Sequence, residues 1–428
     1  MLEIAPVKLP HTRNVVRGFI IAIGIITAGL VIAQDQETLR VKTSLAAEDP
    51  RFPEYLARLL GHPLTQGDTY IVHTNGEKAF PAMLDAIARA QHRVSFETYI
   101  FGTGTIPERF VTAFEAAARR GVEVKLVLDS VGASNLGDAY LKRLEDAGVR
   151  VGWFNEVASW SFEELNYRTH RKALVVDGDV AFVGGIGIAD QWAMPVEGQA
   201  TWRDTHVEVH GPAAVNVEAA FNENWIETGG VVDPDLLPHE DAPAGGAASI
   251  VVWSSPEGGA SAMKLLYLLS IAAARKTLDI QSPYLITDES TQWSLREARN
   301  RGVRVRLLVE GDLTDAKPVK FASRADYERL MEIGIAIHEY QPAMMHTKAL
   351  VVDGALSIVG SANLDNRSLE LNDELNVAVF DRELATRLLA DFDTDVRRSK
   401  KLDLQEWRSR PIHIRGREKL WSLFGEIF

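Results

Sequence analysis

The feature that most constrains the fold is an internal repeat, because distant stretches of the chain match each other in the same order. RGVEVKLVL at 120–128 is echoed by RGVRVRLLV at 301–309, and AGVRV at 147–151 returns as IGIAI at 333–337. In both copies of the longer pattern a helix-like run ends at a glycine and an apolar strand follows. The repeat predicts that the 428-residue chain folds into two similar halves.

The alternation of helical runs with short apolar strands predicts an α/β fold, in which each half has a largely parallel or mixed sheet flanked by helices. A stretch rich in glycine, proline and acidic residues at 229–249 predicts the linker. We therefore expect a first half at 45–228 and a second half at 250–400. Residues 1–44 precede the halves and residues 401–428 follow them.

A second repeat carries reactive side chains. HRKALVVD begins at His170 and HTKALVVD begins at His346, so both copies have the pattern H-x-K-x-x-x-x-D. Residues two apart on a strand share a face, so His170 is expected beside Lys172, and His346 beside Lys348. Each copy places a nucleophile beside a cation, and their duplication argues against coincidence. Both copies lie in one chain, so one subunit suffices for a site, although the sequence does not fix the number of subunits.

Asp177 and Asp353 complete the two motifs and are included with the candidate catalytic residues. They fall on the opposite face of the strand from the histidines, and each precedes a glycine. Because Asp-Gly turns commonly close hairpins, we expect their role to be structural.

Composition removes several classes of chemistry. The chain has no cysteine, which excludes a thiol nucleophile, thiolate metal sites and disulfides. Its formal net charge is −13, a balance that repels polyanions and argues against a general nucleic-acid partner.

Further segments accompany the two motifs in the same order as in a known family. They are FETYIF at 96–101, WRDTH at 202–206, SPY at 282–284 and GSANLDNRS at 360–368. With these segments the chain resembles the phospholipase D superfamily from about residue 49 to residue 399. Within it, bacterial cardiolipin synthases are the most similar.

The resemblance implies a metal-independent attack on a phosphodiester through a covalent phosphohistidine, with the two halves facing each other across one active site and no cofactor. It also implies an acidic residue downstream of each histidine that holds the imidazole, and Asp204 and Glu374 match those positions. Such a carboxylate fixes the tautomer that leaves the other nitrogen nucleophilic. The residues expected to contact the substrate phosphate are Lys172, Lys348, Asn363, Ser361 and Gly185.

The first half departs from the family pattern at one position. The family has Gly-Gly-x-Asn after the first motif, whereas this chain has Gly187 in the place of the asparagine. One phosphate donor is therefore missing. Backbone amides of the glycine run, including that of Gly185, could replace it, because glycine lets a chain approach an anion closely.

An apolar segment near the start predicts an association with a membrane. Residues 18–33 read GFIIAIGIITAGLVIA, with Lys8, Arg13 and Arg17 before them. A membrane span needs about 20 apolar residues, and basic flanks favour the cytoplasmic side. We expect a single-pass anchor in the bacterial cell membrane, with the catalytic halves on the extracytoplasmic side. The alternative is a cleaved signal peptide ending near Ala33, which would release a secreted or periplasmic protein.

The end of the chain reverses the overall charge. Residues 397–419 contain nine lysines and arginines against three acidic residues, and Leu420, Trp421, Phe424 and Phe428 follow at helical spacing. The pattern predicts a basic amphipathic tail. It could lie on an anionic bilayer or pack on its own domain.

The resemblance implies a phosphatidyltransferase that joins two phosphatidylglycerol molecules of a phospholipid membrane into cardiolipin and releases glycerol. A hydrolytic phospholipase D or another phosphatidyltransferase needs the same residues and differs only in its acceptor. A phosphodiesterase or nuclease is the third reading, and the net charge weakens it. An inactive membrane scaffold is the non-enzymatic alternative, which only Gly187 favours.

Overall fold

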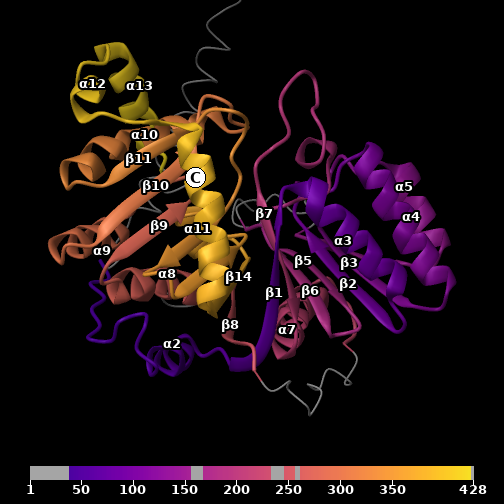
Figure 1. Cartoon of the computed structure of the whole chain (residues 1–428). Coiled ribbons are helices and arrows are strands. Elements are labelled where there is room, and N and C mark those ends of the chain that lie inside the picture. Colours follow the sequence, from indigo (N-terminus) through magenta and orange to yellow (C-terminus); the bar gives the residue numbers. More distant parts are fainter. Residues whose placement is uncertain (1–37, 156–166, 233–244, 256–260, 426–428) are drawn as a thin grey trace, which may run out of the picture.

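The computed structural model describes residues 38–155, 167–232, 245–255 and 261–425, and Figure 1 shows their arrangement. The first half contains β1 (Leu64–Thr74), α3 (Gly76–Arg89), β2 (Arg93–Thr98), α4 (Thr105–Arg119), β3 (Glu123–Asp129), α5 (Asp138–Asp146), β4 (Arg150–Phe154), β5 (Lys172–Val176), β6 (Val180–Gly184), η1 (Asp190–Trp192), β7 (Thr205–His210) and α7 (Pro212–Glu227).

The second half repeats this order of elements. It contains β8 (Ala247–Ser254), α8 (Ala262–Ala273), β9 (Thr277–Gln281), α9 (Glu289–Asn300), β10 (Arg304–Glu310), α10 (Lys317–Glu332), β11 (Ala336–Tyr340), β12 (Ala349–Val352), β13 (Leu356–Gly360), η2 (Arg367–Leu371), β14 (Glu374–Phe380) and α11 (Arg382–Arg397). The predicted duplication and α/β class are therefore confirmed.

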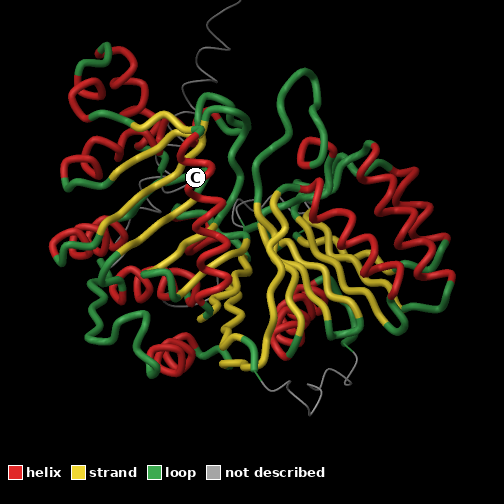
Figure 2. The backbone as a smooth tube through the Cα atoms, in the orientation of Figure 1, coloured by secondary structure: helices red, strands yellow, loops and turns green. Residues whose placement is uncertain are grey.

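The strands form one ladder whose order mirrors about its middle, and Figure 2 shows them in yellow. The order is β11-β10-β9-β12-β13-β14-β8 in the second half, then β1-β7-β6-β5-β2-β3-β4 in the first. Antiparallel pairing of β1 with β8 joins the halves. In each half, three strands are parallel and the others antiparallel, which makes the sheets mixed.

Three large apolar clusters hold the layers together. One lies in the first half between its sheet and α3 and α4, and a second lies in the second half with α8 and α9. The third joins the halves, because it contains residues of β5, β6 and β7 together with residues of β12, β13 and β14, and it includes one face of α7 and of α11. Burial of apolar side chains from both halves stabilises their relative position.

The packing of the chain ends departs from the domain limits expected from the sequence. Helix α2 (Phe52–Leu60) falls in the predicted first half, yet Phe52 and Leu56 belong to the core of the second half. After the second half, β15 (Ser399–Lys401) pairs with β11, and α12 (Leu404–Arg408) and α13 (Ile412–Ser422) follow. The expected linker ends at residue 249, whereas β8 already begins at Ala247.

The expected N-terminal membrane anchor at residues 18–33 lies outside the described residues. Among the helices that the structure describes, none is long and apolar enough to span a bilayer.

The two Asp-Gly pairs close hairpins, as the sequence predicted. Asp177 turns the chain between β5 and β6, and Asp353 does so between β12 and β13, both with positive φ angles. Each carboxylate also accepts three backbone N–H bonds from the start of a neighbouring strand. Asp177 binds residues 91–93 and Asp353 binds residues 275–277, at 2.7–2.9 Å. These aspartates tie the hairpins to the central parallel strands.

We expect Asp177→Asn to lower the free energy of unfolding by about 2 kcal/mol, because the amide turns a donor toward one of the three N–H groups while still tolerating a positive φ. Urea unfolding followed by circular dichroism measures the change. Asp85→Asn is the control, since Asp85 makes only an exposed ion pair with Arg89. Equal stability of the two variants would contradict the structural role.

Candidate active site

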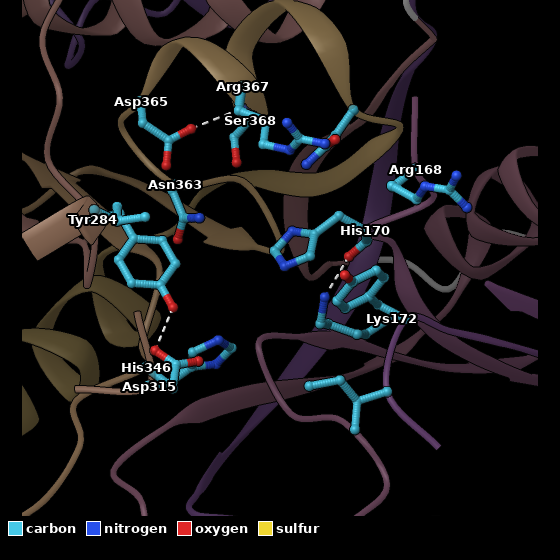
Figure 3. Close-up of a pocket in the computed structure, with 14 residues that line it drawn as sticks. Arg168, His170, Lys172, Tyr284, Asp315, His346, Asn363, Asp365, Arg367 and Ser368 are labelled. Atoms are coloured by element: carbon cyan, nitrogen blue, oxygen red, sulfur yellow. Dashed lines mark hydrogen bonds between the residues drawn. The ribbon is translucent and has the colours of Figure 1, made fainter. Parts of the chain in front are cut away.

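The two repeated histidines line one pocket between the halves. The pocket has a volume of about 390 Å³ and is lined by His170 and Lys172 from the first motif and by His346 from the second (Figure 3). Its other lining residues are Tyr99, Ile100, Arg168, Tyr284, Asp315, Val319, Asn363, Asp365, Arg367, Ser368 and Asn372. Segments far apart in the sequence thus form a single site.

Backbone hydrogen bonds between the halves place each histidine. The N–H of His170 donates to the carbonyl of Asp373 at 2.8 Å, and the N–H of His346 donates to the carbonyl of Arg203 at 2.7 Å. Asp373 immediately precedes β14, and Arg203 lies just before β7 in the corresponding place. The backbone of each histidine is therefore bonded to the other half, whereas the strand that follows it pairs within its own half.

The imidazoles are held by carboxylates in the same crossed manner. His170 Nδ1 lies 2.9 Å from Glu374 Oε1, and His346 Nδ1 lies 2.8 Å from Asp204 Oδ2. A carboxylate at Nδ1 stabilises the tautomer with its proton there and leaves Nε2 with a lone pair. The sequence predicted these two acids, and the structure adds that each serves the histidine of the opposite half.

Burial favours the neutral form of both imidazoles by lowering their pKa values. It lowers the pKa of His170 to about 4, against the opposing effect of Glu374. Burial, followed by the positive charge of Lys348, also lowers the pKa of His346. A neutral imidazole is the form that can attack phosphorus. An entering phosphodiester anion would favour the imidazolium again, because opposite charges attract strongly in a buried site.

The two carboxylates remain ionised although they are fully buried. Burial alone would raise the pKa of Glu374, but its pairing with His170 and the charge of Lys172 outweigh this and lower the pKa. Asp204 behaves alike, because His346 and Lys348 lower its pKa against the effect of burial. Each acid therefore stays an acceptor for an imidazole N–H.

The motif lysines lie beside the histidines. Lys172 Nζ donates to the carbonyl of His170 at 2.6 Å, and Lys348 Nζ donates to that of His346 at 2.7 Å. Burial lowers the pKa of Lys172 to about 7 and that of Lys348 to about 8. A bound phosphate would restore their charge, because it supplies the buried ammonium groups with an anion.

Of the residues expected to bind phosphate, Asn363 lines the pocket, with its side-chain oxygen buried. The expectation for Ser361 and Gly185 is wrong. Ser361 is fully buried, and its hydroxyl donates to Glu374. The amide of Gly185 donates to the carbonyl of Thr205. Ser361 therefore supports a carboxylate directly, whereas Gly185 leaves the space that the Asp204 carboxylate occupies.

Asp177 and Asp353 were included with the candidate catalytic residues, and the structure corrects this. Their carboxylates bind backbone amides at the hairpin turns, and neither residue lines the pocket. The turn follows the strand, so the aspartate lies at the far end of the strand from the histidine.

Trp192 holds Asp204, a role that no sequence pattern predicted. Its indole Nε1 donates to Asp204 Oδ2 at 2.9 Å, and its ring lies 5.6 Å from that of His346. In the other half the hydroxyl of Ser361 makes the corresponding contact to Glu374. The Asp204 carboxylate lies so close to Gly185 that a Cβ there would come within 2.3 Å of it. A serine does not fit, and the tryptophan supplies the donor from another direction.

The same tryptophan explains the departure at Gly187. A Cβ at this position would lie 3.0 Å from Ile100 Cβ and 3.2 Å from Trp192 Cη2. An asparagine would have to displace these buried side chains. The space that an asparagine side chain would need at position 187 is therefore filled by Trp192 and Ile100.

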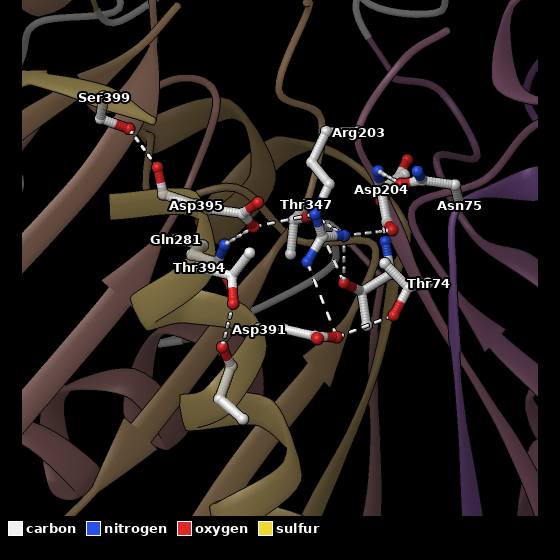
Figure 4. A network of polar contacts seen from close by, with 12 residues as sticks. Thr74, Asn75, Arg203, Asp204, Gln281, Thr347, Asp391, Thr394, Asp395 and Ser399 are labelled. Atoms are coloured by element: carbon white, nitrogen blue, oxygen red, sulfur yellow. Dashed lines mark hydrogen bonds and ion pairs between the residues drawn. The ribbon is translucent and has the colours of Figure 1, made fainter. Parts of the chain in front are cut away.

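A network behind Asp204 fixes its backbone (Figure 4). Arg203 Nε donates to Asp395 Oδ2 at 2.8 Å, and its Nη1 donates to the carbonyl of Asp204 and to Thr205 Oγ1. In the second half the corresponding place before the acid is taken by Asp373 instead of an arginine. Its partner is Arg171, whose Nη2 lies 3.7 Å from Asp373 Oδ2. Buried ion pairs across the halves therefore brace both carboxylates.

The pocket is also lined by basic and acidic side chains. Arg168 and Arg367 line it with Asp315 and Asp365 (Figure 3). Burial raises the pKa of Asp365 to about 7. The sequence placed two of these residues in the segment 360–368 but assigned them no role. Among the described residues, no cluster of three histidine or acidic side chains forms a metal site.

Sequence comparisons decide the family. A sequence model described as "Cardiolipin synthase, PLD-like domain" matches residues 83–225 and 267–396. The cardiolipin synthase of Geobacillus thermodenitrificans is 33% identical over 378 residues, which cover 87% of this chain and 75% of that protein. The chain belongs to the cardiolipin synthase family of phospholipase D-like proteins. It is an enzyme of the phosphatidyltransferase class. A probable cardiolipin synthase of Bacillus subtilis is 30% identical, with 92% and 79% of the two chains covered.

Two solved structures share the fold. The phosphatidylserine synthase of Haemophilus influenzae matches with a TM-score of 0.69 and 13% identity, over 88% of this chain and all of that one. The polyphosphate kinase of Porphyromonas gingivalis matches with a TM-score of 0.55 and 14% identity, over 91% of this chain and 58% of that one. At these identities the likeness concerns the architecture of two similar halves.

We expect Trp192→Phe to lower kcat roughly tenfold with little change in KM, because Asp204 loses one hydrogen bond and His346 loses part of its orientation. Steady-state phosphatidyl transfer measures the effect. Trp253→Phe is the matched control, since Trp253 packs on His62 away from the pocket. Equal kcat values for the two variants would show that the indole N–H does not position the site.

Proposed function

We propose that this enzyme joins two phosphatidylglycerol molecules into cardiolipin and releases glycerol. The observation that carries the proposal is the pair of imidazoles in one pocket, each bound at Nδ1 to a carboxylate of the opposite half. Two such groups can serve as nucleophile and as proton carrier in the same transfer. The relatives described as cardiolipin synthases support the choice of lipid.

In the first step His170 Nε2 attacks phosphorus of one phosphatidylglycerol, and a phosphorus–nitrogen bond forms. His346 takes up a proton from solvent when the phosphodiester anion binds beside it. The bond from phosphorus to the glycerol oxygen breaks, and protonated His346 gives this oxygen its proton. In the second step the glycerol hydroxyl of another phosphatidylglycerol loses its proton to His346 and attacks the same phosphorus. The phosphorus–nitrogen bond then breaks, and both imidazoles return to their starting state.

Lys172 and Asn363 are placed to stabilise the negative oxygens on phosphorus during both steps, because they line the pocket beside His170. Lys348 lies under His346 and adds positive charge from the other side. Ser361 was expected to be a further donor to the phosphate, but its hydroxyl binds Glu374, so of the residues in the segment 360–368 expected to contact the phosphate only Asn363 is placed for it.

We place this reaction at a bacterial cell membrane, where the lipid substrate lies. A single-pass anchor within residues 1–44, with the catalytic halves on the extracytoplasmic side, remains our proposal for the attachment, and signal-peptide cleavage is the alternative. The formal charge of −13 disfavours a nuclease.

Purified enzyme in phosphatidylglycerol vesicles should produce cardiolipin and free glycerol in equal amounts without added metal. Mass spectrometry of the lipids and an enzymatic glycerol assay measure both products. Phosphatidic acid as the sole lipid product would replace the proposal by hydrolysis. Lys142→Ala, on the exposed face of α5, is the control for preparation effects and should retain full activity.

The order of roles predicts different behaviour of the two histidine variants. His170 is favoured as the nucleophile because its side chain is 13% exposed, whereas that of His346 is 5% exposed and packs between Trp192 and Trp202. With a lipid analogue whose leaving group needs no proton, His346→Ala should accumulate a phosphatidyl adduct. His170→Ala should form none. Intact-mass measurement after acid-free quenching detects the adduct in each variant. An adduct in His170→Ala and none in His346→Ala would reverse the roles.

A further inference from the structure

Helix α13 has apolar residues on two opposite faces, and only one face is covered. Ile414 and Trp421 are half-buried and Glu418 is buried, so this side faces the domain. Glu418 accepts a hydrogen bond from Arg410 at 2.7 Å and lies 3.4 Å from Arg324 of α10. The structure thus confirms that the tail packs on its own domain, beside α10 (Figure 1).

The other face of α13 carries large apolar side chains into solvent. Ile412 is 86% exposed, Leu420 is 56% exposed and Leu423, directly after the helix, is 71% exposed. At about 100° per residue these three fall within about 80° of arc on the helix. They form one stripe on the surface, which we call the α13 stripe. Such a stripe needs a second apolar partner.

Basic residues flank the α13 stripe on both sides. Arg415 and Lys419 lie along one edge and Arg417 lies along the other, and all three are exposed. Arg415 also lies 3.5 Å from Glu328 of α10, which partly offsets its charge. The acidic residue of this helix, Glu418, points to the opposite side and is neutralised by Arg410. A positive, apolar face in a chain of net charge −13 fits an anionic surface with an apolar interior, which is an anionic lipid bilayer.

The position of α13 connects this face with the active-site pocket. The guanidinium of Arg417 lies 3.9 Å from the ring centre of Phe321, which belongs to helix α10 and lies on a different face of it from Val319 of the pocket wall. Gly425 is packed so closely on Ile286 that a Cβ would lie 3.1 Å from its Cγ2. Ile286 in turn is two residues beyond Tyr284 of the pocket wall. The C-terminal end of the α13 stripe therefore lies next to the elements that form the pocket.

We propose that the α13 stripe docks on an anionic bilayer and holds the pocket wall of α10 next to the lipid surface. The inference rests on the proposed action on membrane phospholipids. Docking would shorten the path of a lipid headgroup from the bilayer to the pocket, independently of any attachment through residues 1–44.

The absence of cysteine from the chain allows a direct test. Leu423→Cys in the full-length protein is labelled with a polarity-sensitive fluorophore and reconstituted into vesicles of phosphatidylglycerol or of phosphatidylcholine. Val231→Cys is the matched control, because Val231 is 76% exposed and lies in the first half, after α7. In phosphatidylglycerol vesicles the label at 423 should shift to the blue and be quenched by lipid-borne quenchers about threefold more than the label at 231.

Lys419→Glu in the labelled protein should weaken this quenching, and so should high salt, because both reduce the attraction to anionic lipid. Equal, water-like signals at 423 and 231 would overturn the proposal. A blue shift without lipid quenching would overturn it too, since it would assign the stripe to a second copy or another protein. The readout needs no turnover, so it separates this inference from the proposed reaction, which the lipid products test.

Discussion

The active site depends on one interaction that occurs twice, the hydrogen bond between an imidazole of one half and a carboxylate of the other. Neither half contains a complete pair, because His170 binds Glu374 and His346 binds Asp204. A small shift between the halves would break both bonds and leave buried charges without partners, which is costly in a low-dielectric interior. The apolar cluster between the sheets and the ion pairs of Arg171 and Arg203 therefore serve the chemistry by holding the two halves in register.

The two histidine–carboxylate pairs are built from different side chains. Glu374 is longer by one methylene and leaves room for the hydroxyl of Ser361, whereas Asp204 lies closer to its neighbouring strand and requires Gly185 there. Trp192 then supplies the missing donor and also encloses His346. The absence of the family's asparagine at Gly187 is thus part of a consistent local repacking and does not point to a dead site.

The sequence predicted the duplication, the mixed α/β halves and the reactive residues because these follow from repeated patterns and strand periodicity. The Asp-Gly turns were also predictable, since a carboxylate before glycine at a strand end has few other roles. The crossed pairing of acids and histidines was not, because it depends on how the halves pack. For the same reason Ser361 and Gly185 were assigned to the phosphate, although they face the carboxylates. Trp192 was missed because it lies in the three-residue 3₁₀-helix η1, which is too short to give a periodic signal.

The two halves are related by an approximate twofold symmetry about the pairing of β1 with β8, and both belong to a single polypeptide. In a dimer of identical halves, a substitution that favours one imidazole as the attacking group would occur in both subunits, so neither imidazole would be favoured over the other. A covalent fusion removes this constraint, so mutations can accumulate on one side only. The tryptophan around His346 and the serine beside Glu374 are differences of this kind. Because both halves belong to one chain, the two sides of the site can differ, and the site can have a direction.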